Sequence, residues 1–235
     1  DWTQAGWRNL NSFAQSGNLN LLCQPDGVVQ RKLARVAFEA KGDAFEPFAF
    51  GQKGYAYNIA VEHRIKLIVY GENGSLEYSG LDTHKDKPKE TTEEWLVNYY
   101  KGSGFDDLVR LGIDQGVLDS EIANDERLKY YTPPMEEAND LGVEMHWYSY
   151  YQKWVPQENF YYAAKHTGFE TNDQGRTCGT YTKYSSFDDK TDDYHFFMGL
   201  CKFGLGRASR DAQQDIRRHH LTRDEGIRLV ELYDQ

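Results

Sequence analysis

The sequence lacks the phosphate-binding motifs that mark the most common nucleotide enzymes. It contains no Gly-x-x-x-x-Gly-Lys-Ser/Thr loop, no Gly-x-Gly-x-x-Gly after an expected strand and no Gly-x-Ser-x-Gly elbow. The motifs of P-loop NTPases, of dinucleotide-binding Rossmann domains and of α/β-hydrolases are therefore missing from this chain.

Cysteines and long apolar runs are also scarce. Cys23, Cys178 and Cys201 are widely spaced and form no Cys-x-x-Cys pair, so they do not indicate a disulfide framework or a zinc knuckle. No apolar run approaches the roughly 18 to 20 residues that span a bilayer, and no secretory signal opens the chain. We predict a cytoplasmic protein with reduced thiols and no membrane insertion.

Basic residues are fewer than acidic ones. The sequence has 27 Lys and Arg and 37 Asp and Glu, so the formal net charge is -10. The summed field repels phosphate backbones, so nucleic-acid binding would need a local basic patch. Aromatic residues are plentiful instead, with 17 Tyr and 12 Phe. Such rings suit ligands with apolar and polar groups, sugars among them, although a core or interface role is at least as common for any single Tyr.

The spacing of apolar residues predicts an α/β fold. Apolar clusters and helix-like stretches alternate between residues 10 and 69, a βαβ rhythm that favours a parallel sheet. The expected strands and clusters are 19–23, 48–50, 66–70 and 143–148, and the expected helices are 6–14, 31–40, 57–63, short helices within 93–118, 157–165, 188–201, 209–217 and 222–232. Pro156 suits a first helical turn, and Thr222 followed by Glu225 forms a capping box.

Three segments follow from this pattern. We expect residues 1–81 to form a nucleotide-binding α/β portion, residues 82–142 to form a loop and a helical insertion, and residues 143–235 to supply a strand and the C-terminal helices. The polar stretch 82–94 is interpreted as a solvated loop or lid.

Two expected strands each run directly into a glycine-containing turn, Gly51-Gln52-Lys53-Gly54 and Gly71-Glu72-Asn73-Gly74. Gln52 and Lys53 come after the stretch 48–50, and Glu72 and Asn73 come after the strand that ends at Tyr70. Ligands of open α/β sheets bind at such strand ends, so we expect these groups to surround one crevice. Each motif alone is also common in turns that bind no ligand.

Two further blocks carry candidate chemistry. The first combines rings with hydrogen-bonding side chains that suit a sugar, although packing of a buried strand and helix explains its aromatic residues equally well; it contains His146, Tyr148, Glu158 and Asn159. The second spans residues 179–207 and contains Thr180, Tyr181, Ser185, Asp188, Asp189, Lys190, Lys202 and Arg207. Its two aspartates are candidate ligands of a divalent cation, or simply favourable charges at a helix N-terminus, and its cations could neutralise a departing pyrophosphate.

Taken in order, these blocks resemble the N-acetyl sugar amidotransferase family of lipopolysaccharide and nonulosonic-acid biosynthesis, which is related to the PP-loop ATP pyrophosphatases. The resemblance covers nearly the whole chain and includes Glu77 beside Tyr78. It implies a Rossmann-like fold of the adenine nucleotide α-hydrolase type with a helical C-terminal part. The family's Ser-Gly-Gly-x-Asp-Ser phosphate loop is expected before Asp1, and the chain by itself is expected to be inactive.

The resemblance also implies an activity. An amide oxygen of the nucleotide sugar would attack the α-phosphate of ATP, with Mg²⁺ and with Lys190, Lys202 and Arg207 as catalytic cations, and ammonia would then displace AMP to leave an acetamidino group. Its binding residues would be Gln52, Lys53, Tyr70, Glu72, Asn73, Glu77, His146, Tyr148, Glu158, Asn159, Thr180, Tyr181 and Ser185, with Asp188 and Asp189 as metal ligands. A separate glutaminase would supply ammonia. The alternatives are a non-catalytic sugar-nucleotide-binding module and a PP-loop enzyme acting on tRNA.

Overall fold

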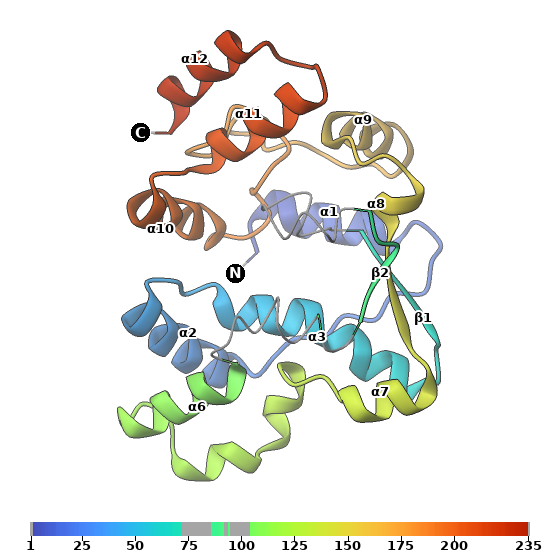
Figure 1. The fold of residues 1–235 in the computed structure, drawn as a ribbon, viewed down its shortest axis with the longest axis vertical. Helices are drawn as coiled ribbons and strands as arrows, with labels where there is room; N and C mark the ends of the chain where they lie inside the picture. Colours follow the sequence, from blue (N-terminus) through green and yellow to red (C-terminus); the bar gives the residue numbers. More distant parts are fainter. Residues whose placement is uncertain (1, 72–85, 92–93, 95–103, 235) are drawn as a thin grey trace. The chain divides into compact units, whose positions relative to one another are not determined.

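The computed structural model describes residues 2–71, 86–91, 94 and 104–234 (Figure 1). These residues divide into two compact units. One unit is continuous and spans Cys23–Lys153, whereas the other joins the N-terminal residues up to Leu22 to the segment from Trp154 to the C-terminus. The second unit is therefore formed by two segments that lie far apart in the sequence.

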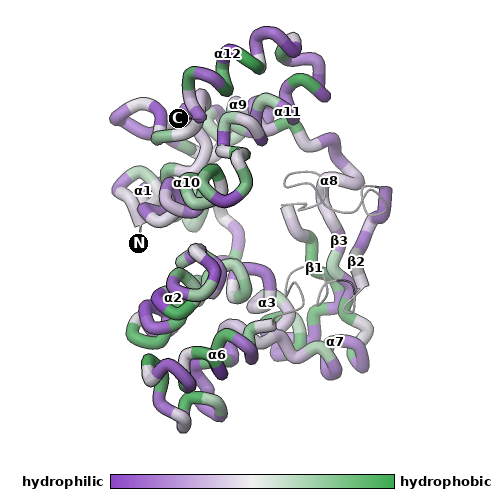
Figure 2. The backbone as a smooth tube through the Cα atoms, turned by 60° about the vertical axis from the view of Figure 1, so that its left-hand side comes forward, coloured by the Kyte–Doolittle hydropathy of each residue, from purple (hydrophilic) through white to green (hydrophobic). Residues whose placement is uncertain are grey.

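The continuous unit is built on three packed helices, α2 (Gly27–Lys41), α3 (Glu46–Glu62) and α6 (Phe105–Asp114). The carboxylate of Asp26 starts α2, because it accepts 2.9 Å hydrogen bonds from the amides of the next helical residues, and Gly42 ends it in the left-handed conformation. The helices bury one apolar cluster, which includes Leu33, Phe50, Phe105, Leu108 and Tyr131. Figure 2 shows the hydrophobic residues of α2 and α6 among hydrophilic ones, as expected of helices with one buried face.

A small mixed sheet completes this unit. Its strands are β1 (Leu67–Tyr70), β2 (Lys89–Glu90) and β3 (Glu144–Trp147), in the order β1-β3-β2, with β1 parallel and β2 antiparallel to β3. Met145 and Trp147 are buried, and Met145 packs with Tyr57 of α3 and Ala138 of α7 (Met135–Leu141). The strands expected at 66–70 and 143–148 are confirmed.

The strand expected at 48–50 is wrong, because these residues lie inside α3. Pro47 fits the first helical turn, and Gly51 and Gly54, interpreted from sequence as a turn, are helical. A Cβ at Gly51 would lie 1.8 Å from Cε1 of Tyr130, and a Cβ at Gly54 would lie 3.2 Å from Cδ of Pro133. These glycines therefore allow a close approach to the helix, rather than a turn of the chain.

Residues 19–26 have no regular secondary structure, so the first apolar cluster is not a strand. Among the described residues the parallel pairing is that of β1 with β3. Helices with a small sheet are consistent with an α/β class, and the Rossmann-like topology remains a proposal.

The second unit is helical. It contains α1 (Gln4–Ala14), α9 (Pro156–His166), α10 (Asp192–Phe203), α11 (Arg207–Arg217) and α12 (Arg223–Tyr233). All five helices were expected from sequence. The capping box is present in both directions, since Thr222 Oγ1 accepts from the amide of Glu225 at 3.3 Å and the Glu225 carboxylate accepts from the amide of Thr222 at 2.8 Å.

The continuous unit also contains three short elements, the 3₁₀ turns η2 (Ser120–Asn124) and η3 (Glu126–Tyr130) and the helix α8 (Tyr148–Tyr151). All three cysteines are free thiols. No helix in the described part of the chain is long and apolar enough to cross a membrane.

Candidate functional site

The second unit contains a buried polar network around α11. Thr180 is fully buried, and its hydroxyl donates a 3.3 Å hydrogen bond to Asp211 while accepting one of 3.1 Å from the amide of Thr182. Arg207 lies one helical turn before Asp211, with 3.1 Å between its Nε and Oδ1 of the carboxylate. Burial raises the pKa of Asp211, and the Arg207 guanidinium opposes that rise. The structure thus brings together Thr180 and Arg207, two predicted site residues.

A second carboxylate lies one turn further along α11. Tyr181 donates a 2.7 Å hydrogen bond from its hydroxyl to Oδ2 of Asp215, and burial together with this bond raises the pKa of Tyr181 above its ordinary range. Burial also raises the pKa of Tyr184 to about 12, and the ring of Tyr184 stacks on Phe160 at 4.8 Å. These phenols are therefore neutral donors near neutral pH.

Arg207 also lies beside acidic residues before and at the start of α10. Its guanidinium is 4.5 Å from the ring centroid of Phe196, and its charge acts on both Asp188 and Asp192. Burial, with the neighbouring charge of Asp188, raises the pKa of Asp192 to about 6, even though Arg207 opposes the change. A carboxyl that titrates near neutral pH beside a cation is a candidate proton-transfer group.

The N-terminus of α11 already holds an anion that belongs to the chain. The carboxylate of Asp234 accepts 2.9 Å hydrogen bonds from the amides of Ala208 and Ser209. A Cβ at Gly206 would lie 2.4 Å from Oδ1 of Asp234, so glycine is required there for this contact. The Gly-Leu-Gly-Arg segment at 204–207 is thus shaped around a carboxylate.

The other two predicted catalytic cations lie on the surface of the same unit. Lys190 is an exposed turn residue, and Lys202 is exposed in the last turn of α10, with Nζ 5.5 Å from the ring centroid of Phe203. Arg207 is the partly buried member of the set.

Asp188 and Asp189 are the predicted metal ligands, and that role stays a prediction. Asp189 Oδ1 accepts hydrogen bonds from the amide of Thr191 at 2.7 Å and from its hydroxyl at 2.5 Å. The residues that the structure describes include no group of three or more His, Cys, Asp or Glu that could hold a metal ion. No chemical step is therefore assigned to a metal at these carboxylates.

Helix α9 contributes two predicted binding residues. Glu158 is exposed in its first turn, whereas Nδ2 of Asn159 is buried and has no hydrogen-bond partner among the described residues. An unsatisfied buried donor costs about 1 to 3 kcal/mol, so this amide suits an acceptor on a ligand. Ser185 is partly buried, and its carbonyl accepts a 3.4 Å hydrogen bond from Thr177.

The continuous unit holds the other predicted residues. Lys53 is buried on α3 with Nζ 5.7 Å from the ring centroid of Tyr70, so these two come together, but from a helix and a strand end rather than two strand ends. Gln52 is exposed on α3. Glu72, Asn73 and Glu77 lie outside the described residues.

His146 and Tyr148 lie at the end of β3 and the start of α8. Tyr148 is 47% exposed, and His146 is hydrogen-bonded on both ring nitrogens, to Glu144 at 3.0 Å and to Tyr151 at 2.5 Å. Neither Glu144 nor Tyr151 was a predicted site residue.

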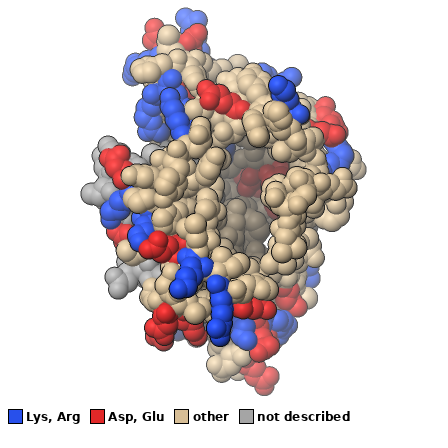
Figure 3. Space-filling view, turned by 90° about the vertical axis from the view of Figure 1, so that its right-hand side faces the viewer, with Lys and Arg blue, Asp and Glu red and all other residues tan. Residues whose placement is uncertain are grey.

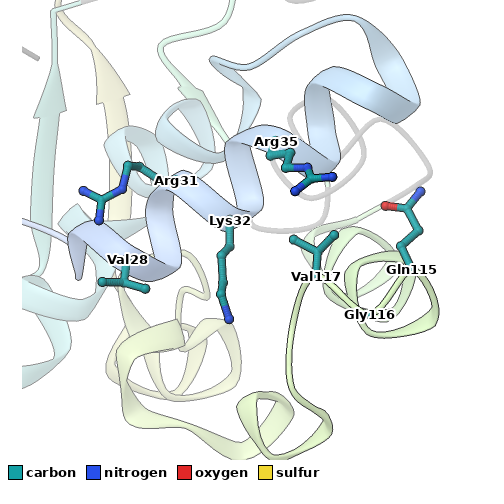
Figure 4. A pocket seen from close by; sticks show the side chains of 7 residues that line it. All are labelled: Val28, Arg31, Lys32, Arg35, Gln115, Gly116 and Val117. Atoms are coloured by element: carbon teal, nitrogen blue, oxygen red, sulfur yellow. The ribbon is translucent and has the colours of Figure 1, made fainter.

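An open groove of about 540 Å³ lies between α2 and the end of α6 (Figure 4). It is lined by Val28, Arg31, Lys32, Arg35, Gln115, Gly116 and Val117. Figure 4 shows the three cations extending in different directions. Lys32 faces Asp119 at 3.6 Å and Arg35 pairs with Glu39 at 2.8 Å, so the groove does not concentrate its positive charge on one point.

Residues 178–235 match the family model described as "LPS biosynthesis protein WbpG-like, C-terminal domain". The matched segment contains Thr180, Tyr181, Arg207 and the whole of α11 and α12. The family match and the buried polar network therefore lie in the same part of the chain. No curated protein matches the chain.

Sequence reasoning missed Asp211, Asp215 and Asp234. A signal for the first two was present, because Arg207, Asp211 and Asp215 are spaced four residues apart and therefore share one face of a helix. Asp234 gave no such signal, since its contact with α11 depends on how α12 packs back.

Proposed function

We propose that the protein is an ATP-dependent amidotransferase of lipopolysaccharide biosynthesis that converts the N-acetyl group of a bacterial nucleotide sugar into an acetamidino group. The match of residues 178–235 to the WbpG-like C-terminal domain supports the pathway. The resemblance of the ordered sequence blocks to N-acetyl sugar amidotransferases supports the reaction. The proposal includes a Rossmann-like nucleotide-binding portion, a cytoplasmic location and a separate glutaminase that supplies ammonia.

The network around α11 supports a site for an anionic substrate. Arg207 is held in one orientation by Asp211 and by the ring of Phe196, so its guanidinium is already ordered before a ligand arrives. A preorganised cation stabilises charge that develops on a transferring phosphate more effectively than a mobile one. Lys190 and Lys202, both exposed, would approach the same anion from the surface.

The proposed chemistry has two displacement steps. Attack of the amide oxygen on the α-phosphate of ATP forms an O-adenylated imidate and releases pyrophosphate. Ammonia then adds to the imidate carbon, loses a proton and expels AMP, which leaves the amidine. Asp192 lies close to Arg207 and has a pKa of about 6, so it is a candidate acceptor for that proton.

The direct test uses the protein in its full natural length. It is supplied with ATP, Mg²⁺, ammonium and a panel of acetamido nucleotide sugars, and AMP and the product mass are measured. We expect AMP and a product 1 Da lighter than the substrate, because NH replaces O. Formation of neither AMP nor an amidine with any sugar of the panel would contradict the enzyme proposal.

Two substitutions locate the site. Arg207→Ala and Lys190→Ala should each lower AMP formation at least about tenfold, since each removes a cation from the phosphate. Lys165→Ala, at the exposed end of α9, is the matched control and should leave turnover unchanged. Unchanged turnover in the Lys190 variant would remove that residue from the site.

A non-catalytic sugar-nucleotide-binding module is the second candidate. The buried, unsatisfied Nδ2 of Asn159 is compatible with it, because that donor suits a ligand acceptor whether or not a reaction follows. Calorimetric binding of a nucleotide sugar without AMP formation would support this candidate. Action on tRNA is the third, and the formal net charge of -10 argues against it. On the face shown in Figure 3, Lys and Arg are interspersed with Asp and Glu.

A further inference from the structure

We propose that Glu144, His146 and Tyr151 form a proton-transfer relay that ends in a reactive, solvent-accessible phenol. The relay lies in the continuous unit and is argued from its own geometry, independently of the amidotransferase proposal. Its ligand class is a small polar molecule with an exchangeable N–H or O–H proton.

The sheet positions the first two members. Side chains alternate along β3, so Met145 and Trp147 point into the core while Glu144 and His146 share the opposite face. Lys89 lies opposite His146 in the antiparallel pair with β2, and its ammonium group is hydrogen-bonded to the Glu144 carboxylate. The Lys89 and His146 hydrogen bonds lower the pKa of Glu144, so the carboxylate is ionised near neutral pH.

The chain then brings Tyr151 back to the strand. Helix α8 is a single turn that begins directly after β3, and it returns the hydroxyl of Tyr151 to within 2.5 Å of Nδ1 of His146. The imidazole and phenol rings are nearly parallel, with 9° between their planes. A turn directly after a strand is sufficient to pair residues five positions apart.

The hydrogen bonds fix the direction of proton transfer. The ionised Glu144 can only accept, so Nε2 of His146 carries the proton that faces it at 3.0 Å. Nδ1 is then an acceptor, and Tyr151 donates its hydroxyl proton to it. When a ligand passes a proton to the Tyr151 oxygen, the phenolic proton moves to Nδ1 and the resulting imidazolium is stabilised by Glu144.

The end of the relay is accessible. Tyr151 is 59% exposed, and Tyr148 and Tyr150 beside it are 47% and 50% exposed. A histidine orientated by a carboxylate and directed at an exposed hydroxyl is the arrangement that activates nucleophilic hydroxyls in general. Three exposed rings in the same turn also provide a surface on which a sugar ring can stack.

The test measures the reactivity of the phenol without any substrate. N-acetylimidazole transfers its acetyl group to a tyrosine oxygen; the phenolic proton passes through His146 to the departing imidazole. Acetylation of each tyrosine near neutral pH is followed by tandem mass spectrometry, with hydroxylamine reversal to confirm the ester. Tyr150 is the exposed neighbour control, and Tyr162 is a second, because its ring lies 4.4 Å from that of His166 with no hydrogen bond between the two side chains.

We expect Tyr151 to react at least about tenfold faster than Tyr150 and Tyr162, because His146 accepts its phenolic proton. His146→Phe should reduce the Tyr151 rate to that of Tyr150, and Glu144→Gln should reduce it in part. His166→Phe should change neither rate. Equal reactivity of Tyr151 and Tyr150 in the unaltered protein, or an unchanged Tyr151 rate in the His146 variant, would overturn the proposal.

Discussion

The carboxylate of Asp234 accepts a 2.9 Å hydrogen bond from the backbone amide of Ser209. The contact joins the end of α12 to the first turn of α11, and these two helices lie side by side in Figure 1. Asp234 therefore acts as an N-cap supplied from a distant position in the sequence. It satisfies amides of α11 that no neighbouring side chain reaches, since Gly206 is the N-cap residue.

Replacing Asp234 should loosen this pair of helices. Asp234→Ala removes both hydrogen bonds to α11, and a lost N-cap of this kind costs about 1 kcal/mol. Urea unfolding monitored by circular dichroism measures the change. Asp224→Ala, in the exposed first turn of α12, is the control and should cost less. Equal stability of the Asp234 variant and the original protein would show that the cap is dispensable.

Gly51→Ala should disrupt the contact of α3 with η3. The new methyl group would overlap the ring of Tyr130, and overpacking of this kind costs about 1 to 3 kcal/mol. Gly71→Ala is the matched control, because no atom of the described residues lies within 4 Å of a Cβ at that position. Thermal unfolding distinguishes the two variants, and an undiminished melting temperature for Gly51→Ala would contradict the packing.

Asp192→Asn should change how stability depends on pH. The folded-state pKa of about 6 is above the ordinary value of 3.8, so the native protein binds the extra proton and stability falls as pH rises from about 4 to about 6. Above that window the ionised carboxylate costs up to about 3 kcal/mol, less after solvent screening. The variant should therefore be more stable near pH 7 and unchanged near pH 4. Asp140→Asn, an exposed substitution on α7, should show no such difference.

Thr180 tests the polar network beneath α11. Thr180→Val keeps the shape of the side chain but removes the donor to the buried Asp211, which should cost about 1 to 3 kcal/mol. Thr180→Ser retains the hydroxyl and should be closer to the original protein. Chemical denaturation of the two variants provides the comparison, and equal loss from both would assign the effect to the lost methyl group.

The helices of the second unit could be predicted because their signals are local. Thr222 and Glu225 are three residues apart, and Pro156 lies at the first helical position, so short-range chemistry was sufficient to place both helix starts. The stretch 48–50 could not be placed in the same way. Its short apolar run, followed by glycines, is compatible with a strand and a turn, and only the ring of Tyr130 against Gly51 explains why a helix needs glycine there.

Some residues of the candidate site could likewise be recognised from sequence, whereas their partners could not. Thr180, Tyr181 and Arg207 were recognised by residue type, but their partners Asp211 and Asp215 become functional neighbours only when α11 is folded. The His146–Tyr151 contact depends on a strand that ends and a turn that begins at adjacent residues. Composition contains no information about such a return of the chain.

The sequence by itself determined the charge balance, the position of most helices and the residue types available for chemistry, because these depend on neighbours within a few positions. Tertiary structure alone decided that the N-terminal helix α1 and the last 80 or so residues share one compact unit. It also decided that an aspartate near the C-terminus caps α11 and that a tyrosine hydroxyl meets a strand histidine. These contacts depend on burial and on hydrogen bonds between distant segments, and their energies exist only once the chain has packed.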